Sequence, residues 1–343
     1  MKRFMVCLGF SVMCAMFLVS CTQNTKKSAS YKPVIGLSLD SLVVERWRRD
    51  VDSFTRAATD LDATVKLRVA NQDADTQIAQ IKSLLDSGID VLVVIPNHAD
   101  KLTEVCRMVS RKHIPVISYD RLVNRANVDL YISFDNERVG SLMASAALSA
   151  KPKGNYVIIN GAITDNNAFM INRGYHQVLD PQVASGNINL VKEIWPSDWI
   201  SDEVKSRFEA LLGEEKNIDV VLCGNDMLAE TVIGVLSENR MLGKTLVLGQ
   251  DAELSACQRV AEGSQYATIY KPIEKLSLKA AALAVMLAKG EKLPAASTIN
   301  DGFYDVPYVK LEPILVTKDS LETTVIKDGF HRREDVFRNV PNR

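Results

Sequence analysis

From residue 34 onward, short runs rich in β-branched residues alternate with longer segments of helical periodicity. The run 91–95 (VLVVI) is apolar at every position, which is typical of a strand buried on both faces of a parallel sheet. The segment 76–87 has apolar residues three and four positions apart, with Asp73 or Asp75 available as a cap and Gly88 at its end. This alternation predicts a doubly wound α/β fold.

The pattern predicts more strands than one small sheet holds. The expected strands span residues 34–39, 64–70, 90–95, 114–119, 128–134, 155–160, 188–194, 219–223, 245–249 and 266–270. The expected helices include residues 76–87, 99–112, 138–150, 202–213 and 273–289. A new strand–helix series begins at Asn155, and no low-complexity linker precedes it. We therefore expect two lobes, divided after Phe134-Asp135 and joined by structured crossovers.

The first 21 residues differ in kind from the rest. Lys2 and Arg3 precede an apolar run that ends at Val19, followed by a small residue and Cys21, as in a secretory signal. The run is too short for a comfortable membrane span. Residues 18–21 (LVSC) resemble the bacterial lipobox, which implies cleavage before Cys21 and a lipid on its sulfur. An ordinary signal cleaved elsewhere is the alternative. Residues 1–21 are thus expected to be a lipoprotein signal peptide, and residues 22–32 a flexible tether.

Several function classes lack support in the sequence. The formal net charge is −1 and no long Lys/Arg run occurs, so we expect no nucleic-acid partner. The chain has no GxGxxG, GxxxxGK[ST] or GxSxG motif, and its four histidines show no metal-ligand spacing, so no cofactor and no metal are expected. Cys106, Cys223 and Cys257 are expected to be small buried residues, because their number is odd and their spacing is irregular.

Hydrogen-bonding and aromatic residues follow many of the predicted strands, at the edge where ligands bind in open α/β sheets. They are Asp40, Arg46-Trp47, Asp120-Arg121, Asp165-Asn166-Asn167, Trp195, Trp199, Asn225-Asp226, Gln250-Asp251 and Lys271. Any one of them alone is more often a helix cap or a packing residue. Together they suit a neutral polyol, because indole rings cover the C–H faces of a pyranose and planar polar groups bond its hydroxyls. The sequence therefore predicts a binding site for a small sugar.

Six motifs around these residues carry a family resemblance. They are residues 45–47 (ERW), 119–121 (YDR), 131–137 (YISFDNE), 165–168 (DNNA), 249–252 (GQDA) and 270–273 (YKPI). They strongly resemble the bacterial xylose-binding proteins, a branch of the periplasmic sugar-binding family that also includes ribose- and galactose-binding proteins. The resemblance extends from about residue 33 to about residue 331.

The resemblance implies a type I periplasmic binding protein, with two Rossmann-like lobes that are each a mainly parallel doubly wound sheet. Three hinge crossovers would lie near residues 135–140, 268–271 and 300–304. The N-terminal lobe would then hold residues 33–137 and 271–301, and the C-terminal lobe residues 138–270 and 302–331. Residues 332–343 would form a tail.

The resemblance also implies roles for nine residues, carried over position by position. Trp47 and Trp199 would cover the two faces of the sugar. The hydroxyl ligands would be Arg46, Asp120 and Arg121 from the first lobe, Asn167, Asn225 and Asp251 from the second, and Lys271 at the edge of the hinge. No residue is expected to be catalytic, because proteins of this kind bind their ligand without chemistry.

Two segments depart from the pattern of the relatives. Pro196-Ser197-Asp198 precedes Trp199 where the relatives have a glycine beside their second stacking tryptophan, so the path of this loop is open. Ala168-Phe169-Met170 replaces a more polar continuation. We expect Phe169 to narrow the pocket or to change what it admits.

The expected function is capture of a monosaccharide, D-xylose first, by a monomer tethered through Cys21 in the periplasm or cell envelope, for delivery to an ABC-type permease. Another sugar or polyol (ribose, galactose, allose or an inositol derivative) and a membrane sensor kinase as partner remain alternatives. An enzyme acting on sugars would need a paired acid and base near the cleft. A sugar-responsive repressor would carry an N-terminal helix-turn-helix where this chain has its signal.

Overall fold

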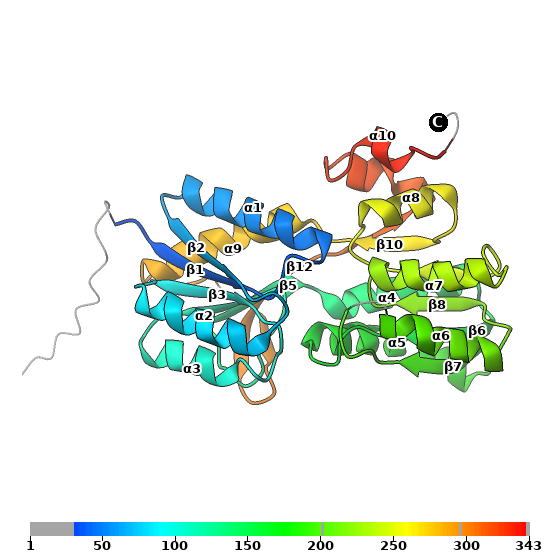
Figure 1. The fold of residues 1–343 in the computed structure, drawn as a ribbon, viewed down its shortest axis with the longest axis horizontal. Coiled ribbons are helices and arrows are strands. Elements are labelled where there is room, and N and C mark those ends of the chain that lie inside the picture. The colour runs from blue at the N-terminus through cyan, green and yellow to red at the C-terminus, as the bar shows by residue number, and fades with distance from the viewer. Residues whose placement is uncertain (1–30, 200–201, 295–296, 341–343) are drawn as a thin grey trace, which may run out of the picture.

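The computed structural model describes residues 31–199, 202–294 and 297–340, which form two α/β lobes side by side (Figure 1). The predicted signal peptide, Cys21 and most of the predicted tether lie outside these residues. In the described ranges no helix is both long and apolar enough to cross a membrane.

The first lobe is built on a seven-stranded sheet in the order β11-β12-β5-β4-β3-β1-β2. Its strands are β1 (Val34–Leu39), β2 (Thr64–Val69), β3 (Val91–Ile95), β4 (Val116–Tyr119), β5 (Leu130–Phe134), β11 (Ser297–Asn300) and β12 (Asp305–Leu311). Its helices are α1 (Glu45–Asp60), α2 (Ala74–Asp86), α3 (Thr103–Arg111) and α9 (Ile273–Ala288). All pairings in this sheet are parallel except that of β11 with β12.

Strand β3 is buried on both faces, as its unbroken apolar run predicted. Val91 and Val93 pack in one core cluster with Phe54 of α1 and residues of α9. Leu92 and Val94 pack in another cluster with residues of α2 and α3. Because alternate side chains of a strand point to opposite faces, both layers of helices bury against the same strand.

The second lobe is built on a six-stranded sheet in the order β13-β10-β9-β8-β6-β7. Its strands are β6 (Gly154–Ile159), β7 (Ile188–Ile194), β8 (Val220–Cys223), β9 (Leu246–Leu248), β10 (Ala267–Tyr270) and β13 (Ile314–Thr317). Its helical segments are α4 (Asn136–Ala150), α5 (Asn166–Ala184), α6 (Asp202–Glu214), α7 (Asp226–Glu238), α8 (Leu254–Glu262), η1 (Lys318–Ser320), η2 (Glu322–Ile326) and α10 (Arg333–Val336). The predicted fold class, two doubly wound lobes, is confirmed.

Helices α4 and α5 touch backbone to backbone through two glycines. A Cβ atom on Gly140 would lie 2.0 Å from the carbonyl oxygen of Ile171, and one on Gly174 would lie 2.0 Å from the carbonyl oxygen of Glu137. Only glycine allows this approach. The contact sets the position of the first turn of α5, which carries Asn167.

The chain crosses between the lobes three times. It crosses at Asp135, between β5 and α4, and at Lys271-Pro272, between β10 and α9. The third crossover joins β12 to β13, between Leu311 and Ile314.

The prediction was wrong for the third crossover and for residues 302–311. These residues were expected in the C-terminal lobe, whereas β12 pairs with β5 in the first sheet. Val306 is buried in the first lobe, and the ring of Tyr308 stacks on that of Tyr131 with centroids 4.7 Å apart. The strands β11, β12 and β13 were not predicted. Which sheet edge such short strands join depends on partners far away in the sequence.

Candidate functional site

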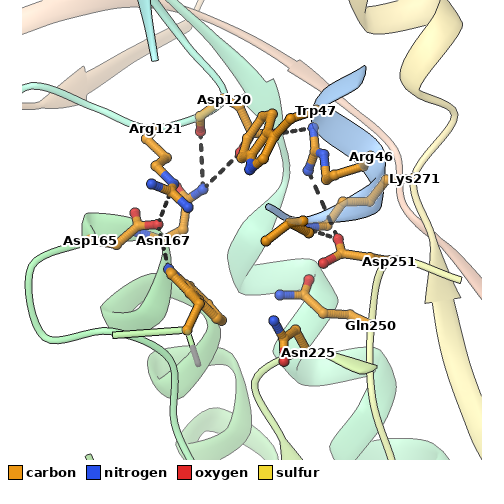
Figure 2. A pocket seen from close by; sticks show the side chains of 12 residues that line it. Arg46, Trp47, Asp120, Arg121, Asp165, Asn167, Asn225, Gln250, Asp251 and Lys271 are labelled. Atoms are coloured by element: carbon orange, nitrogen blue, oxygen red, sulfur yellow. Dashed lines mark hydrogen bonds and ion pairs between the residues drawn. The ribbon is translucent and has the colours of Figure 1, made fainter. Parts of the chain in front are cut away.

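A pocket lies between the lobes at the carboxyl ends of their strands (Figure 2). It contains about 350 Å³ of empty space, part of which is open to solvent. Its lining residues are Val44, Arg46, Trp47, Asp120, Arg121, Asp165, Asn167, Trp199, Asn225, Gln250, Asp251 and Lys271. All nine residues predicted from the sequence are among them, so the fold brings every one of them to a single place. Their role in binding stays a prediction.

Helix starts and left-handed turns direct these side chains into the pocket. Asp165 caps α5 by accepting from the backbone NH of Asn167 at 2.9 Å, and Asn225 caps α7 by accepting from that of Leu228 at 2.9 Å. Asp120 and Asp251 have φ values of 61° and 96°. These values lie in the left-handed region that non-glycine residues seldom occupy. The surrounding hydrogen bonds must hold these two carboxylates in place.

The guanidinium of Arg46 lies close to three carboxylate groups. Its guanidinium donates to Asp120 at 2.7 Å and to Asp50 at 3.1 Å, and it lies 3.8 Å from Asp251 of the other lobe. Burial raises the pKa of Asp50 to about 6, against the opposing charge of Arg46. Behind Asp50, the Tyr119 hydroxyl donates to its second oxygen. Arg46 is therefore fixed from both sides before any ligand arrives.

Asp120 remains ionised although it is buried. Burial by itself would raise its pKa, but the charges of Arg46, Lys271 and Arg121 together lower it below its ordinary value. Lys271 also forms an ion pair with Asp251 at 3.1 Å. The pocket thus presents charged acceptors and charged donors in alternation, and both kinds can bond neutral hydroxyl groups.

An ion pair and a hydrogen bond also connect the lobes beside the pocket. Arg121 lies 2.8 Å from Asp165 through its Nε and donates through a terminal nitrogen to Asp40 at 2.9 Å. The Asn167 amide donates to the backbone carbonyl of Asp120 at 3.1 Å. Burial raises the pKa of Asp165, against the charge of Arg121. These contacts hold the lobes in a closed arrangement.

The two predicted stacking tryptophans have different surroundings. Trp47 is 2% exposed, and the guanidinium carbons of Arg46 and Arg121 lie 4.4 Å and 5.3 Å from its ring centroid. Trp199 is partly exposed and donates from its indole nitrogen to Asp165 at 3.1 Å. A Cβ atom on Gly161 would lie 2.0 Å from the Trp199 ring. The glycine that makes room for this ring therefore lies at the end of β6.

Two polar atoms of the lining residues have no protein partner among the described residues. They are the indole nitrogen of Trp47 and the side-chain oxygen of Gln250. The amide nitrogen of Gln250 donates to the carbonyl of Gly224, which holds the side chain in place. Buried polar groups nearly always have a partner in native proteins. One free donor and one free acceptor at the pocket match the needs of a hydroxyl-bearing ligand.

Three lining residues, Val44, Asp165 and Gln250, are not among the nine ligands that the resemblance implied. Asp165 and Gln250 do belong to the polar residues that follow the predicted strands, whereas no signal in the sequence indicated Val44. Asp50 was also missed, although its spacing of four from Arg46 places both on one helix face.

The expectation for Phe169 was wrong. Phe169 does not line the pocket; it is 42% exposed and stacks on Trp195 with ring centroids 4.9 Å apart. Asn167 faces the pocket, and a residue two positions later in a helix points to nearly the opposite side. Phe169 therefore does not narrow this pocket.

Metal and thiol chemistry find no support in the part of the chain that the structure describes. It contains no group of three His, Cys, Asp or Glu side chains arranged to hold a metal. Cys106, Cys223 and Cys257 are free and buried, as predicted. Burial raises the pKa of Cys106 to about 12, so this thiol is unreactive.

Comparisons with known proteins match this chain to periplasmic and solute binding proteins. Residues 35–292 match the family model described as periplasmic binding protein domain. The chain is 43% identical over 304 residues to the D-xylose-binding periplasmic protein of Haemophilus influenzae, covering 88% of this chain and 92% of that protein. It is 41% identical over 314 residues to the Escherichia coli protein of the same name, covering 91% and 95%. A solved structure of a carbohydrate transporter solute binding protein from Chloroflexus aurantiacus, in complex with D-glucose, matches with a TM-score of 0.82 at 24% identity, covering 89% of this chain and 98% of that one.

Proposed function

Because the chain belongs to the periplasmic binding protein domain family, we propose that it captures D-xylose in the pocket between its two lobes. The family consists of periplasmic sugar-binding transport proteins and not of enzymes, so binding is the whole of the reaction. One observation carries the proposal. Nine residues expected to hold a sugar, spread over 226 positions from Arg46 to Lys271, all line one pocket.

The chemistry of the pocket fits a pyranose. Trp47 and Trp199 are proposed to cover the two faces of the ring, where apolar C–H groups are exposed. Arg46, Asp120 and Arg121 from the first lobe are proposed to bond the hydroxyl rim together with the polar residues of the second lobe. The second-lobe and hinge ligands are Asn167, Asn225, Asp251 and Lys271. A misplaced hydroxyl would leave buried partners unpaired at a cost of about 1–3 kcal/mol each, which provides specificity.

Capture is proposed to work by closure of the lobes. Side chains from both lobes can contact the sugar at the same time only when the lobes are close. Sugar binding therefore favours the closed form. The ion pair between Arg121 and Asp165 supports that form, as does the hydrogen bond from Ala99 NH to Thr164 O at 3.0 Å. Opening at the three crossovers would release the sugar.

The N-terminal sequence and the family support a proposal for anchoring and delivery. We propose that the signal is cleaved before Cys21, that Cys21 carries the lipid, and that residues 22–32 tether a monomer in the periplasm or cell envelope. An ABC-type permease is the proposed recipient, with a membrane sensor as the alternative. Mass spectrometry of the mature protein should find Cys21 at the N-terminus with a lipid on its sulfur. A mature N-terminus elsewhere, or Cys21 without lipid, would overturn the lipid anchor.

Calorimetry tests the ligand and the site together. The purified protein is titrated with D-xylose, ribose, arabinose, glucose, galactose and myo-inositol, and xylose is expected to bind most tightly. Trp47→Ala and Trp199→Ala should each weaken binding strongly. Trp195→Ala is the matched control, because this tryptophan lies outside the pocket lining and should leave the affinity unchanged. Tighter binding of another sugar would replace xylose as the ligand, and no binding of any of them would overturn the proposal.

A further inference from the structure

A second cavity lies between the lobes directly beside the pocket. It contains about 650 Å³ of empty space, compared with about 350 Å³ in the pocket itself, and part of each space is open to solvent. The first lobe contributes Asp40, Gln72 and Asn97 to its wall, and the second contributes Thr164, Asp198 and Met227. Three further residues, Val44, Arg121 and Trp199, line both spaces. The two spaces are therefore neighbours with shared lining residues.

The polar wall of the second cavity is already ordered. The Asn97 amide donates to one oxygen of Asp40 at 2.8 Å, and Arg121 donates to the other at 2.9 Å. The backbone NH of Asn97 donates to Gln77 at 2.8 Å. A fixed chain of hydrogen bonds thus runs from Arg121 at the pocket to Asn97 in the second cavity. Pre-ordered groups of this kind lower the entropic cost of binding a ligand.

Trp199 presents a fixed aromatic surface to both spaces. Its indole nitrogen is bound to Asp165 and its ring lies against Gly161, so its orientation is held from two sides. Trp199 and Asp198 belong to the loop in which this sequence departs from its relatives. Hence this loop contributes two neighbouring residues to the second cavity.

The second cavity is present although the two lobes touch. The lobes are already in contact through Arg121 and Asp165 and through Ala99 and Thr164, and the cavity persists in this closed arrangement. We propose that it is a second sugar subsite, which accepts a pyranose joined by a glycosidic bond to the xylose unit in the pocket. The proposal rests on the proposed function. It widens the ligand class from a monosaccharide to a xylose-containing disaccharide, which is bound without being cleaved.

Calorimetry with two ligands and two variants tests the subsite. The purified protein is titrated with D-xylose and with β-1,4-linked xylobiose, and xylobiose is also titrated in the presence of saturating xylose. The filling variant is Met227→Trp, because Met227 is partly exposed and lines only the second cavity. The matched control is Ser237→Trp, an exposed position on the same helix.

One xylobiose per chain is expected to bind, in competition with xylose. Met227→Trp should weaken xylobiose binding by about tenfold or more by steric exclusion and leave xylose binding within about twofold. Retained xylose binding also shows that this variant is folded. Ser237→Trp should change neither affinity.

Two results would overturn the subsite. The first is that the unmodified protein binds xylose but not xylobiose, a result that needs no variant to interpret. The second is that Met227→Trp weakens the binding of both sugars equally. In either case the proposed function stands. Failure of every sugar to bind would instead overturn the proposed function and the subsite with it.

Discussion

The Nε atom of Arg121 in the first lobe lies 2.8 Å from a carboxylate oxygen of Asp165 in the second lobe, and both side chains are buried. The same carboxylate oxygen accepts a hydrogen bond from the indole of Trp199, and Arg121 also binds Asp40. The closing of the lobes is thereby coupled to the orientation of an aromatic ring at the pocket.

Asp165→Asn should weaken xylose binding by about 2 kcal/mol or more, because Arg121 would remain buried opposite a neutral group. Calorimetry measures the loss, and small-angle scattering should show a more open molecule. Asp100→Asn is the control, since Asp100 pairs with Arg125 at 2.8 Å in a half-exposed position within one lobe. Its expected change is at most about 0.5 kcal/mol. Equal losses in both variants would contradict the coupling.

Gly174→Ala should reduce stability by about 1–3 kcal/mol, because the new Cβ atom would lie 2.0 Å from the carbonyl of Glu137 and force α4 and α5 apart. Affinity for xylose should fall as well, since α5 carries Asn167. Urea unfolding measures the first effect. Gly234→Ala is the matched control: this helical glycine has no neighbour within 4 Å of a new Cβ atom. It should stabilise the protein by about 0.5–1 kcal/mol. Equal effects at the two positions would exclude the proposed close contact.

Asp226 is expected to hold the turn that presents Gln250 and Asp251. Its carboxylate accepts from Gln265 at 2.8 Å, from Thr268 at 2.8 Å and from the backbone NH of Glu253 at 3.1 Å. Asp226→Asn should therefore weaken xylose binding by about 1–3 kcal/mol, the cost of leaving a buried donor unpaired. Affinity that stays unchanged while stability falls would restrict Asp226 to a structural role.

The same residue predicts a pH dependence of stability. Burial raises the pKa of Asp226 to about 7, far above the value of about 3.9 expected in the unfolded chain. The folded state then binds more protons between these values, so this residue lowers stability as pH rises from about 4 to about 7. Asp226→Asn removes this contribution. Urea unfolding at pH 5 and pH 8 measures the free energy of unfolding of both proteins. The variant should be less stable than the unmodified protein by a smaller amount at pH 8 than at pH 5. An equal difference at both pH values would contradict the assignment.

The surroundings of His176 predict a second dependence of stability on pH, in a different pH range. Its ring nitrogens lie 2.7 Å from Asp180 and 2.8 Å from Glu193. Burial opposes its charge, but the two carboxylates raise its pKa above the ordinary value. The folded pKa is the higher one, so the stabilisation is complete below the unfolded pKa of about 6.5 and is lost as pH rises through the folded pKa. His176→Gln should cost about 1 kcal/mol or less at pH 5 and little at pH 9, since the group is partly exposed. His113→Asn, at an exposed position, is the control.

The sequence by itself predicted the features that depend on neighbours along the chain. The apolar run 91–95 indicated a strand covered on both faces, and the spacing in 76–87 indicated an amphipathic helix. Strand ends must meet at one edge of a parallel sheet, so the residues that follow them could be expected to gather in one place. The family resemblance then named nine of these residues as the proposed ligands.

The tertiary structure alone decided the features that depend on segments far apart in the sequence. The strand β12 joins the first sheet because β5 offers it a free edge. Since β5 lies more than 170 positions earlier in the sequence, no local pattern indicates this pairing. Phe169 points away from the pocket because α5 begins at Asn166 and contacts α4 through Gly174. The bridge from Arg121 to Asp165 and the cavity beside it exist only when the lobes are close. No local pattern specifies them, because their free energy comes from contacts that form only after both lobes have folded.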